Sequence, residues 1–278
     1  MTKEKWRRAE ALGFHAGYTY DHLSWQRLEN RPWYGAVPTL AVASLETLRL
    51  KVGTLVTSPN FRHPVPLAKE LLTLDDISGG RLIVGIGAGG NGNDATVLGN
   101  EQWSANERAE RFEEFVTLLD QLLREPRTTN RGNYYAATDA RMLPGTIQLP
   151  RPPFYVAATG SRGMDLTARF AQGWVTTGVT RDKNATCEKN VTRQLTKLRT
   201  ALDEHDRHDG ELAMVLLDGL SNERPLVSLD AFVDWAGRYG ALGITELVIH
   251  WPEPDSLFDF NLATFEKIAL DGLGQLRE

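Results

Sequence analysis

Short apolar runs alternate with longer amphipathic segments along the chain. The runs LKVGTLVT, RLIVGIG and TELVIH are apolar almost without a break rather than at every second position. Such runs are typical of parallel strands that are buried on both faces. The longer segments carry apolar stripes at helical spacing, as in Phe112, Phe115, Val116 and Leu119. The alternation of the two predicts βα units around a parallel sheet.

The pattern predicts eight helices, at 3–12, 36–45, 64–77, 105–124, 164–171, 182–206, 228–239 and 257–270. It predicts seven strands, at 16–20, 50–57, 82–86, 154–158, 173–177, 212–217 and 245–250. We interpret these elements as one domain over residues 1–278, of the α/β class and the (β/α)₈ TIM-barrel type. Such a barrel needs one more strand, of about five residues, before residue 3. A barrel closed in another way or an open doubly wound sheet are the alternatives.

The segment 125–153 interrupts this alternation, because it is long and rich in proline. Long connections of this kind are often lids or binding loops. A structural excursion across the bottom of the barrel is the other interpretation. We expect an insertion here in either case.

Composition excludes several classes of protein. The 278 residues are 41% hydrophobic and 24% charged, which is ordinary for a soluble globular chain. A net charge of −5 disfavours nucleic acid as a partner, and no apolar run is long enough to cross a membrane. The single cysteine, Cys187, excludes a disulfide framework and a cysteine-based zinc site. The reducing cytoplasm is therefore the expected location.

Candidate chemistry lies in the loops that follow the predicted strands, where barrel enzymes build their sites. Three of the six histidines and two tryptophans fall there: His22, His63, His250, Trp25 and Trp251. Imidazoles beside flat aromatic side chains suit a pocket for a large planar ligand. The alternative is that each histidine is a hydrogen-bonded structural residue, and that Asp21-His22 is a helix-capping turn.

Two glycine-rich stretches also follow strands. The first, 85–90, matches G-x-G-x-x-G, but a Rossmann motif opens a helix directly and this one does not. In the second, Gly160, Ser161, Arg162 and Gly163 stand between a strand and a helix, where open N–H groups can hold a phosphate. The alternative there is an ordinary N-cap by Ser161.

These motifs together resemble the bacterial luciferase-like family of flavin and deazaflavin oxidoreductases. The resemblance covers nearly the whole chain and rests on YTYDHL, LKVGTLVTSPNFRHPVPLAKELLTLDDISGGRLIVGIGAGGN, QLPRPPFYVAATGSRGMDLTARFAQGWVTTG and GITELVIHWP. It is stronger toward the branch that uses coenzyme F420 than toward the flavin mononucleotide (FMN) monooxygenases. It implies a barrel with an insertion, often a homodimer, that holds a tricyclic ring in its mouth.

The resemblance also implies roles for individual residues. It makes His22, oriented by Asp21, the group that handles a proton, and it puts a cis peptide bulge at Leu55–Val56. The implied cofactor-binding residues are Leu55, Val56, Gly87, Ala88, Gly89, Gly160, Ser161, Arg162, Gly163 and Thr177. The implied substrate pocket contains Trp25, His63, Asn91, His250 and Trp251.

The resulting hypothesis is an oxidoreductase that moves a hydride between coenzyme F420 and a small organic substrate. Gly90 and Thr180 replace a glutamate and a lysine of the sugar-phosphate dehydrogenase branch, so we do not predict a sugar phosphate. An FMN-dependent monooxygenase and a non-catalytic cofactor-binding or assembly barrel are the alternatives. A metal-dependent hydrolase is disfavoured, because the strand ends lack an obvious set of ligands, and we expect no metal site.

Overall fold

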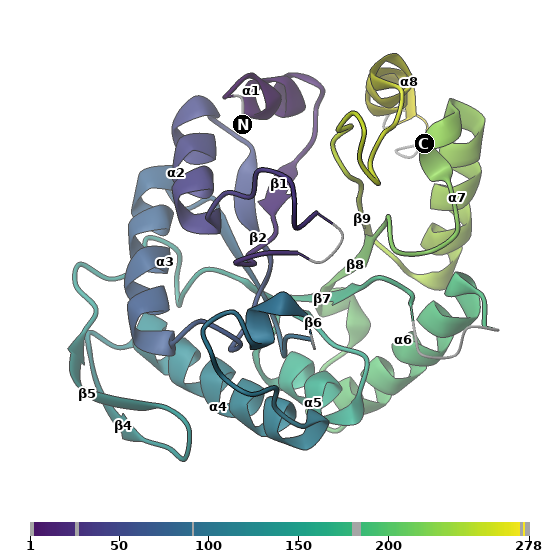
Figure 1. Cartoon of the computed structure of the whole chain (residues 1–278). Helices are drawn as coiled ribbons and strands as arrows, with labels where there is room; N and C mark the ends of the chain where they lie inside the picture. The colour runs from purple at the N-terminus through teal and green to yellow at the C-terminus, as the bar shows by residue number, and fades with distance from the viewer. Residues whose placement is uncertain (1–2, 26–27, 91, 180–184, 273–274, 276–278) are drawn as a thin grey trace.

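Helices and strands alternate through most of the chain in the computed structural model, which describes residues 3–25, 28–90, 92–179, 185–272 and 275 (Figure 1). The helices are α1 (Lys3–Ala11), α2 (Ala36–Glu46), α3 (Pro64–Ser78), α4 (Ala105–Arg124), α5 (Ser161–Phe170), α6 (Cys187–Asp203), α7 (Leu229–Leu242) and α8 (Leu262–Lys267). Shorter helical turns are η1 (Asn93–Ala95), η2 (Asp209–Glu211), η3 (Pro225–Val227) and η4 (Ile268–Gly272).

One sheet of seven parallel strands forms the centre of the molecule. Its strands are β1 (Ala16–Thr19), β2 (Lys51–Thr57), β3 (Leu82–Gly87), β6 (Phe154–Ala157), β7 (Gly173–Thr176), β8 (Ala213–Leu217) and β9 (Glu246–Val248). They pair in this order, and the helices cover the outside of the curled sheet (Figure 1). The prediction of a TIM-type barrel that lacks one strand is confirmed, and the open doubly wound sheet is wrong because strand order follows chain order.

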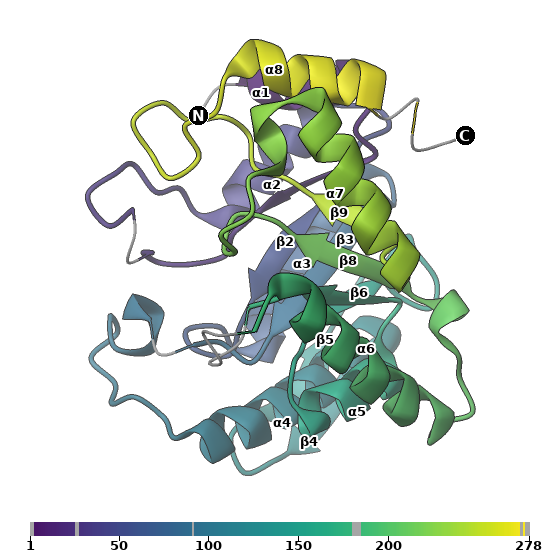
Figure 2. The ribbon, with the colours of Figure 1, turned by 90° about the vertical axis from the view of Figure 1, so that its right-hand side faces the viewer.

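The sheet is not closed among the described residues, since β1 and β9 each have one neighbouring strand. The helices do meet across this opening. Arg8 in α1 donates from Nε to Glu266 Oε1 in α8 at 2.8 Å, and the rings of Phe14 and Phe265 stack with centroids 5.6 Å apart. In Figure 2, α8 lies in front of α1 at the top of the molecule.

Both faces of the sheet are buried, which explains the unbroken apolar runs. One face packs against the helices in the main core, where Trp174 is fully buried and donates from Nε1 to the carbonyl of Ala158 at 2.9 Å. The other face lines the interior of the curled sheet and carries Leu55, Ile83 and Tyr155. Parallel strands under helices are expected to bury both faces in this way.

The 125–153 segment contains a hairpin that the sequence did not predict. Strands β4 (Arg127–Arg131) and β5 (Ala136–Arg141) pair antiparallel on the outside of the molecule, beside α3 and α4 (Figure 1). Glu114 in α4 accepts hydrogen bonds from the main-chain N–H groups of Asn133, Tyr134 and Tyr135 in its turn. The segment returns below the sheet, where Gln148 Nε2 donates to Leu82 O at 2.8 Å. The insertion is confirmed, and no residue of it lines either of the two cavities described below, which favours the excursion across the bottom of the barrel.

No helix in the described part of the chain is long and apolar enough to span a membrane.

Candidate active site

The loops at the carboxyl ends of the strands surround a cavity of about 910 Å³, which we call the mouth cavity. Parallel strands bring these loops to one side of a barrel, however far apart they are in the chain. The ten residues expected to bind a cofactor all line this cavity: Leu55, Val56, Gly87, Ala88, Gly89, Gly160, Ser161, Arg162, Gly163 and Thr177. His22 and Trp25 line it as well.

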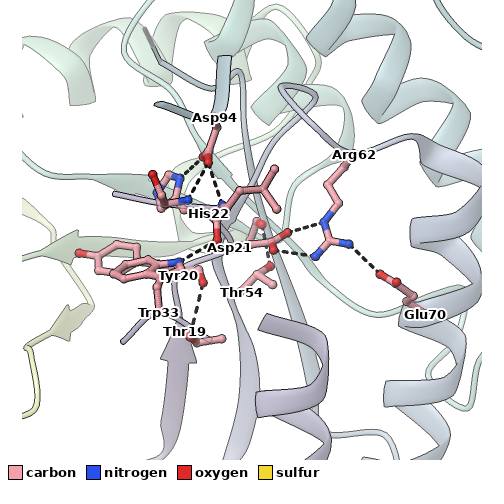
Figure 3. A network of polar contacts seen from close by, with 12 residues as sticks. Thr19, Tyr20, Asp21, His22, Trp33, Thr54, Arg62, Glu70 and Asp94 are labelled. Atoms are coloured by element: carbon pink, nitrogen blue, oxygen red, sulfur yellow. Dashed lines mark hydrogen bonds and ion pairs between the residues drawn. The ribbon is translucent and has the colours of Figure 1, made fainter. Parts of the chain in front are cut away.

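His22 is paired with Asp94, a residue of η1 (Figure 3). The bond joins His22 Nδ1 to Asp94 Oδ2, and Asp94 Oδ1 accepts from Leu23 N at 2.7 Å and Ser24 N at 3.3 Å. The Asp94 side chain is buried, whereas 28% of the His22 side chain is exposed. With Nδ1 held by a carboxylate, Nε2 is the ring nitrogen left for a ligand.

Asp21 does not orient His22, so that part of the prediction is wrong. Its carboxylate takes two hydrogen bonds from Arg62, at 2.9 Å from Nε and 2.7 Å from Nη2 (Figure 3). Arg62 also reaches Glu70 of α3 at 3.1 Å. Successive residues of an extended chain point to opposite sides, which is why Asp21 and His22 have separate partners. Through Arg62 and Glu70, Asp21 ties the loop after β1 to α3.

The back wall of the mouth cavity contains a cis peptide bond between Leu55 and Val56, as the family resemblance implies. The pairing of β2 with β3 shifts register here, between Thr54 and Thr57. Gly87 lies against this bulge, and a Cβ atom at Gly87 would come 2.9 Å from Val56 Cγ2. The lack of a side chain at Gly87 lets a flat group approach the backbone closely at this point.

The N-terminus of α5 opens on the same cavity. Its N-cap is Gly160, which has no side chain to cap the helix, and Ser161 begins the helix rather than capping it. Gly160, Ser161 and Arg162 are exposed, and no described atom lies within 4 Å of a Cβ built on Gly160. Free N–H groups, the helix dipole and an arginine together favour an anion such as a phosphate.

The other predicted pocket residues separate into different places. His63 lines neither cavity: it caps α3 by accepting from Val65 N at 3.2 Å, and its ring meets Tyr135. Burial lowers the pKa of His63. His250 and Trp251 line a second, adjoining cavity. Asn91 lies outside the described residues.

Tyr20 connects the two cavities, because it lines both. Its Oη lies 2.7 Å from His250 Nε2, and its ring stacks on Trp25 at 5.6 Å between centroids. Burial lowers the pKa of His250 to about 4, so the imidazole is neutral at physiological pH. Burial also raises the pKa of the Tyr20 phenol, so the hydroxyl keeps its proton.

Sequence reasoning missed two residues of this site, Asp94 and Tyr20. The signal for Asp94 was an acidic residue within the polar loop after a strand, in the run NGND. In the described part of the chain, no group of three or more His, Cys, Asp or Glu side chains is arranged to hold a metal ion.

The chain belongs to the luciferase-like monooxygenase family, whose model matches residues 2–217. Among curated proteins it is 34% identical over 177 residues to an F420-dependent glucose-6-phosphate dehydrogenase of Microbacterium testaceum, which covers 61% of this chain and 50% of the relative. It is 34% identical over 175 residues to an F420-dependent hydroxymycolic acid dehydrogenase of Mycobacterium tuberculosis, covering 60% and 46% respectively. The chain thus spans about half the length of these relatives.

Solved structures support the fold. An F420-dependent secondary alcohol dehydrogenase in complex with an F420-acetone adduct superposes with a TM-score of 0.79 over 96% of this chain and 94% of its own, at 17% identity. The monooxygenase RslO1 from Streptomyces bottropensis gives 0.77 over 99% and 93%, at 22% identity. At these identities the likeness concerns the fold alone.

Proposed function

We propose that this protein is an oxidoreductase that transfers a hydride between coenzyme F420 and a small organic substrate. The observation that carries the proposal is the meeting, in one cavity, of a histidine–carboxylate pair with the open N-terminus of α5. The names of the curated relatives, which include two kinds of F420-dependent dehydrogenase, agree with it.

The residues of the mouth cavity suit this cofactor. Leu55, Val56 and Gly87 to Gly89 form an apolar wall with small side chains at its glycine end, against which a flat ring system can lie. The cavity volume of about 910 Å³ is in the range of ligand sites. Gly160 to Gly163, with Thr177 beside them, would hold the phosphate. A bound deazaflavin supplies the hydride chemistry, and the protein supplies binding, orientation and the proton.

His22 is the residue that we assign to the proton. It lines the cavity, and its pairing through Nδ1 leaves Nε2 to exchange a proton with the substrate. Asp94 fixes the orientation of the ring, while Asp21 acts only by holding the loop through Arg62. Trp25 offers a flat apolar wall for the substrate.

The substrate class remains a small organic molecule rather than a sugar phosphate. Gly90 has no side chain, so this position of the glycine loop presents no acidic group to a substrate. The chain matches only about half of the length of the dehydrogenase relatives, so their substrates are not assigned to it.

An FMN-dependent monooxygenase is the second candidate. The description of the matching family favours it, and the phosphate cradle at α5 serves either cofactor equally well.

One domain over residues 1–278, a homodimer and a cytoplasmic location complete the proposal. The homodimer rests on the family resemblance, and the location rests on the single Cys187.

Titration of the purified protein with F420 and with FMN, followed by absorbance and fluorescence, tests the proposal. We expect saturable binding of F420 and weaker binding of FMN. Gly160→Glu should weaken both by about tenfold or more, because a carboxylate then faces the phosphate. Gly237→Glu, on an exposed position of α7, is the matched control and should bind normally. Tighter binding of FMN would favour the monooxygenase, and binding of neither would favour the non-catalytic barrel.

A further inference from the structure

The first turns of two neighbouring helices, α4 and α5, both line the mouth cavity (Figure 1). Gly160 to Gly163 stand at the start of α5, and Asn106 and Ala109 stand at the start of α4. The next residue of α4 is Glu110, whose Oε1 lies 3.9 Å from Nη1 of Arg162. A carboxylate therefore lies beside the arginine of the phosphate cradle.

Glu110 is held in this position by hydrogen bonds to both of its oxygens. Tyr134 donates from Oη to Oε2 at 2.7 Å, and Asn106 donates from Nδ2 to Oε1 at 2.5 Å. The bond from Tyr134, the bond from Asn106 and the charge of Arg162 lower the pKa of Glu110, so the side chain is ionised at neutral pH. Glu110 is thus a fixed negative charge close to the cradle.

Tyr134 belongs to the turn of the β4–β5 hairpin, within the inserted segment 125–153. Its main-chain N–H donates to Glu114 of α4 at 3.0 Å. The guanidinium of Arg111 lies 4.4 Å from the centre of its ring and 4.1 Å from that of Trp103, and such contacts favour a fixed ring. The insertion lines neither cavity, yet it reaches the cradle through the hydroxyl of Tyr134.

A carboxylate beside an anion site lowers the affinity for the anion in two ways. It repels the incoming phosphate, and it pairs with the arginine that the phosphate would otherwise contact. The side chains of Arg162 and Glu110 are 57% and 41% exposed, so the effect of this pair is modest rather than decisive.

We propose that the hairpin sets how tightly the protein holds the phosphate of its cofactor, because Tyr134 holds Glu110 and Glu110 competes for Arg162. The proposal rests on the proposed function, since it takes the N-terminus of α5 as the phosphate site. Changes at Tyr134 and Glu110 should act on the phosphate and not on the ring of the cofactor, because neither side chain lines the mouth cavity.

Cofactors with and without their phosphate separate the two contributions. FMN and riboflavin share one ring system and differ in the phosphate, and F420 and its phosphate-free deazaflavin core form a second pair. Fluorescence titration gives the dissociation constants for the pair whose phosphorylated member binds more tightly. Their ratio, which we call the phosphate ratio, measures what the phosphate adds to binding.

Glu110→Gln should raise the phosphate ratio by about two- to fivefold and leave the affinity for the phosphate-free form unchanged. Glu113→Gln is the matched control, because it is also a glutamate of α4 paired with an arginine of α5, at 3.1 Å from Arg169 near the other end of that helix. It should leave the ratio unchanged. At about 1 M salt, where the screening length is about 3 Å, the gain in Glu110→Gln should disappear.

Tyr134→Phe tests the part played by the hairpin. It removes one of the bonds that hold the carboxylate, so the phosphate ratio should rise by about twofold, within the range for an exposed pair. In the Glu110→Gln background the same change should have no effect on the ratio. No effect of Tyr134→Phe in either background would overturn the role of the hairpin.

The inference and the proposed function fail in different ways. Cofactor binding with a phosphate ratio that Glu110→Gln leaves unchanged would overturn the inference alone, as would an equal gain for the phosphate-free form. Binding of neither F420 nor FMN to the unaltered protein and its variants would overturn both.

Discussion

His22 and Asp94 lie 72 positions apart in the chain and meet through Nδ1 and Oδ2 (Figure 3). The other oxygen of Asp94 holds the main chain of Leu23 at 2.7 Å, so a single carboxylate fixes both the imidazole and the loop that carries it. Groups placed in this way lose little freedom when a ligand binds, which favours proton transfer.

Replacing His22 tests its role in proton transfer. We expect His22→Ala to lower turnover by about 10²–10⁴-fold, because a positioned acid or base typically contributes that much. Cofactor affinity should be unchanged, because the cofactor is proposed to sit on other residues. Steady-state kinetics and a cofactor titration measure the two quantities, with His208→Ala as an exposed control. Normal turnover in His22→Ala would remove the assignment.

Asp94 should act through His22 rather than directly on the substrate. Asp94→Asn keeps an acceptor for Leu23 N but loses the charge beside the imidazole, so kcat should fall by about tenfold or more while KM changes little. In the His22→Ala background the same change should have almost no effect on turnover. A double-mutant cycle measures this, and additive losses would show that the two residues act separately.

The Asp21–Arg62 pair should contribute to stability. Asp21 is buried, and Asp21→Asn leaves the half-buried Arg62 guanidinium with Glu70 as its one acidic partner among the described residues, so we expect a loss of about 3 kcal/mol in the free energy of unfolding. Glu70→Gln is the control, because that side chain is 40% exposed and should cost less than about 1 kcal/mol. Chemical denaturation compares the two. A loss no larger for Asp21→Asn than for Glu70→Gln would contradict the prediction.

Gly85 should tolerate no side chain. A Cβ atom at this position of β3 would lie on the carbonyl oxygen of Thr54 in β2, beside the cis bond. We expect Gly85→Ala to lower the free energy of unfolding by at least about 2 kcal/mol, because neither backbone can move without disturbing the sheet. Gly237→Ala, in α7 with open space around it, should instead gain up to about 1 kcal/mol. Equal thermal stability of the two variants would be evidence against this packing.

His250 should make stability depend on pH. Burial lowers its pKa to about 4, against about 6.5 for a free histidine. Between these two pH values the imidazole is protonated in the unfolded chain but stays neutral in the folded protein. Its contribution is therefore complete above pH 6.5 and declines by up to about 3 kcal/mol as the pH falls toward 4. His250→Gln should lose less stability than the unaltered protein between pH 7 and 4.5, as measured by urea unfolding. His208→Gln, at an exposed site, should behave like the unaltered protein; a similar loss in all three would contradict the assignment.

The sequence was sufficient to predict the sheet and most of the mouth cavity. Strands buried on both faces read as apolar runs, and all seven were found, because that pattern depends on burial alone. Strands β4 and β5 were missed because their residues are largely polar and exposed. Their turn is held by hydrogen bonds to Glu114, and only a few of the hairpin's residues, such as Tyr135 and Ala137, reach the main core.

The partner of His22 was not predictable in the same way. Asp21 is adjacent in sequence, and Asp94 becomes a neighbour only once the loops after β1 and β3 meet above the sheet. Likewise, a histidine before a proline-rich helix start, as at His63, can cap the helix or face a ligand, and the sequence does not distinguish the two.

Tyr20, Leu55 and Leu217 form a partition shared by the mouth cavity and the adjoining cavity that His250 lines. A molecule on one side that shifts these side chains alters the affinity on the other side, and thermodynamic linkage requires the same factor in both directions.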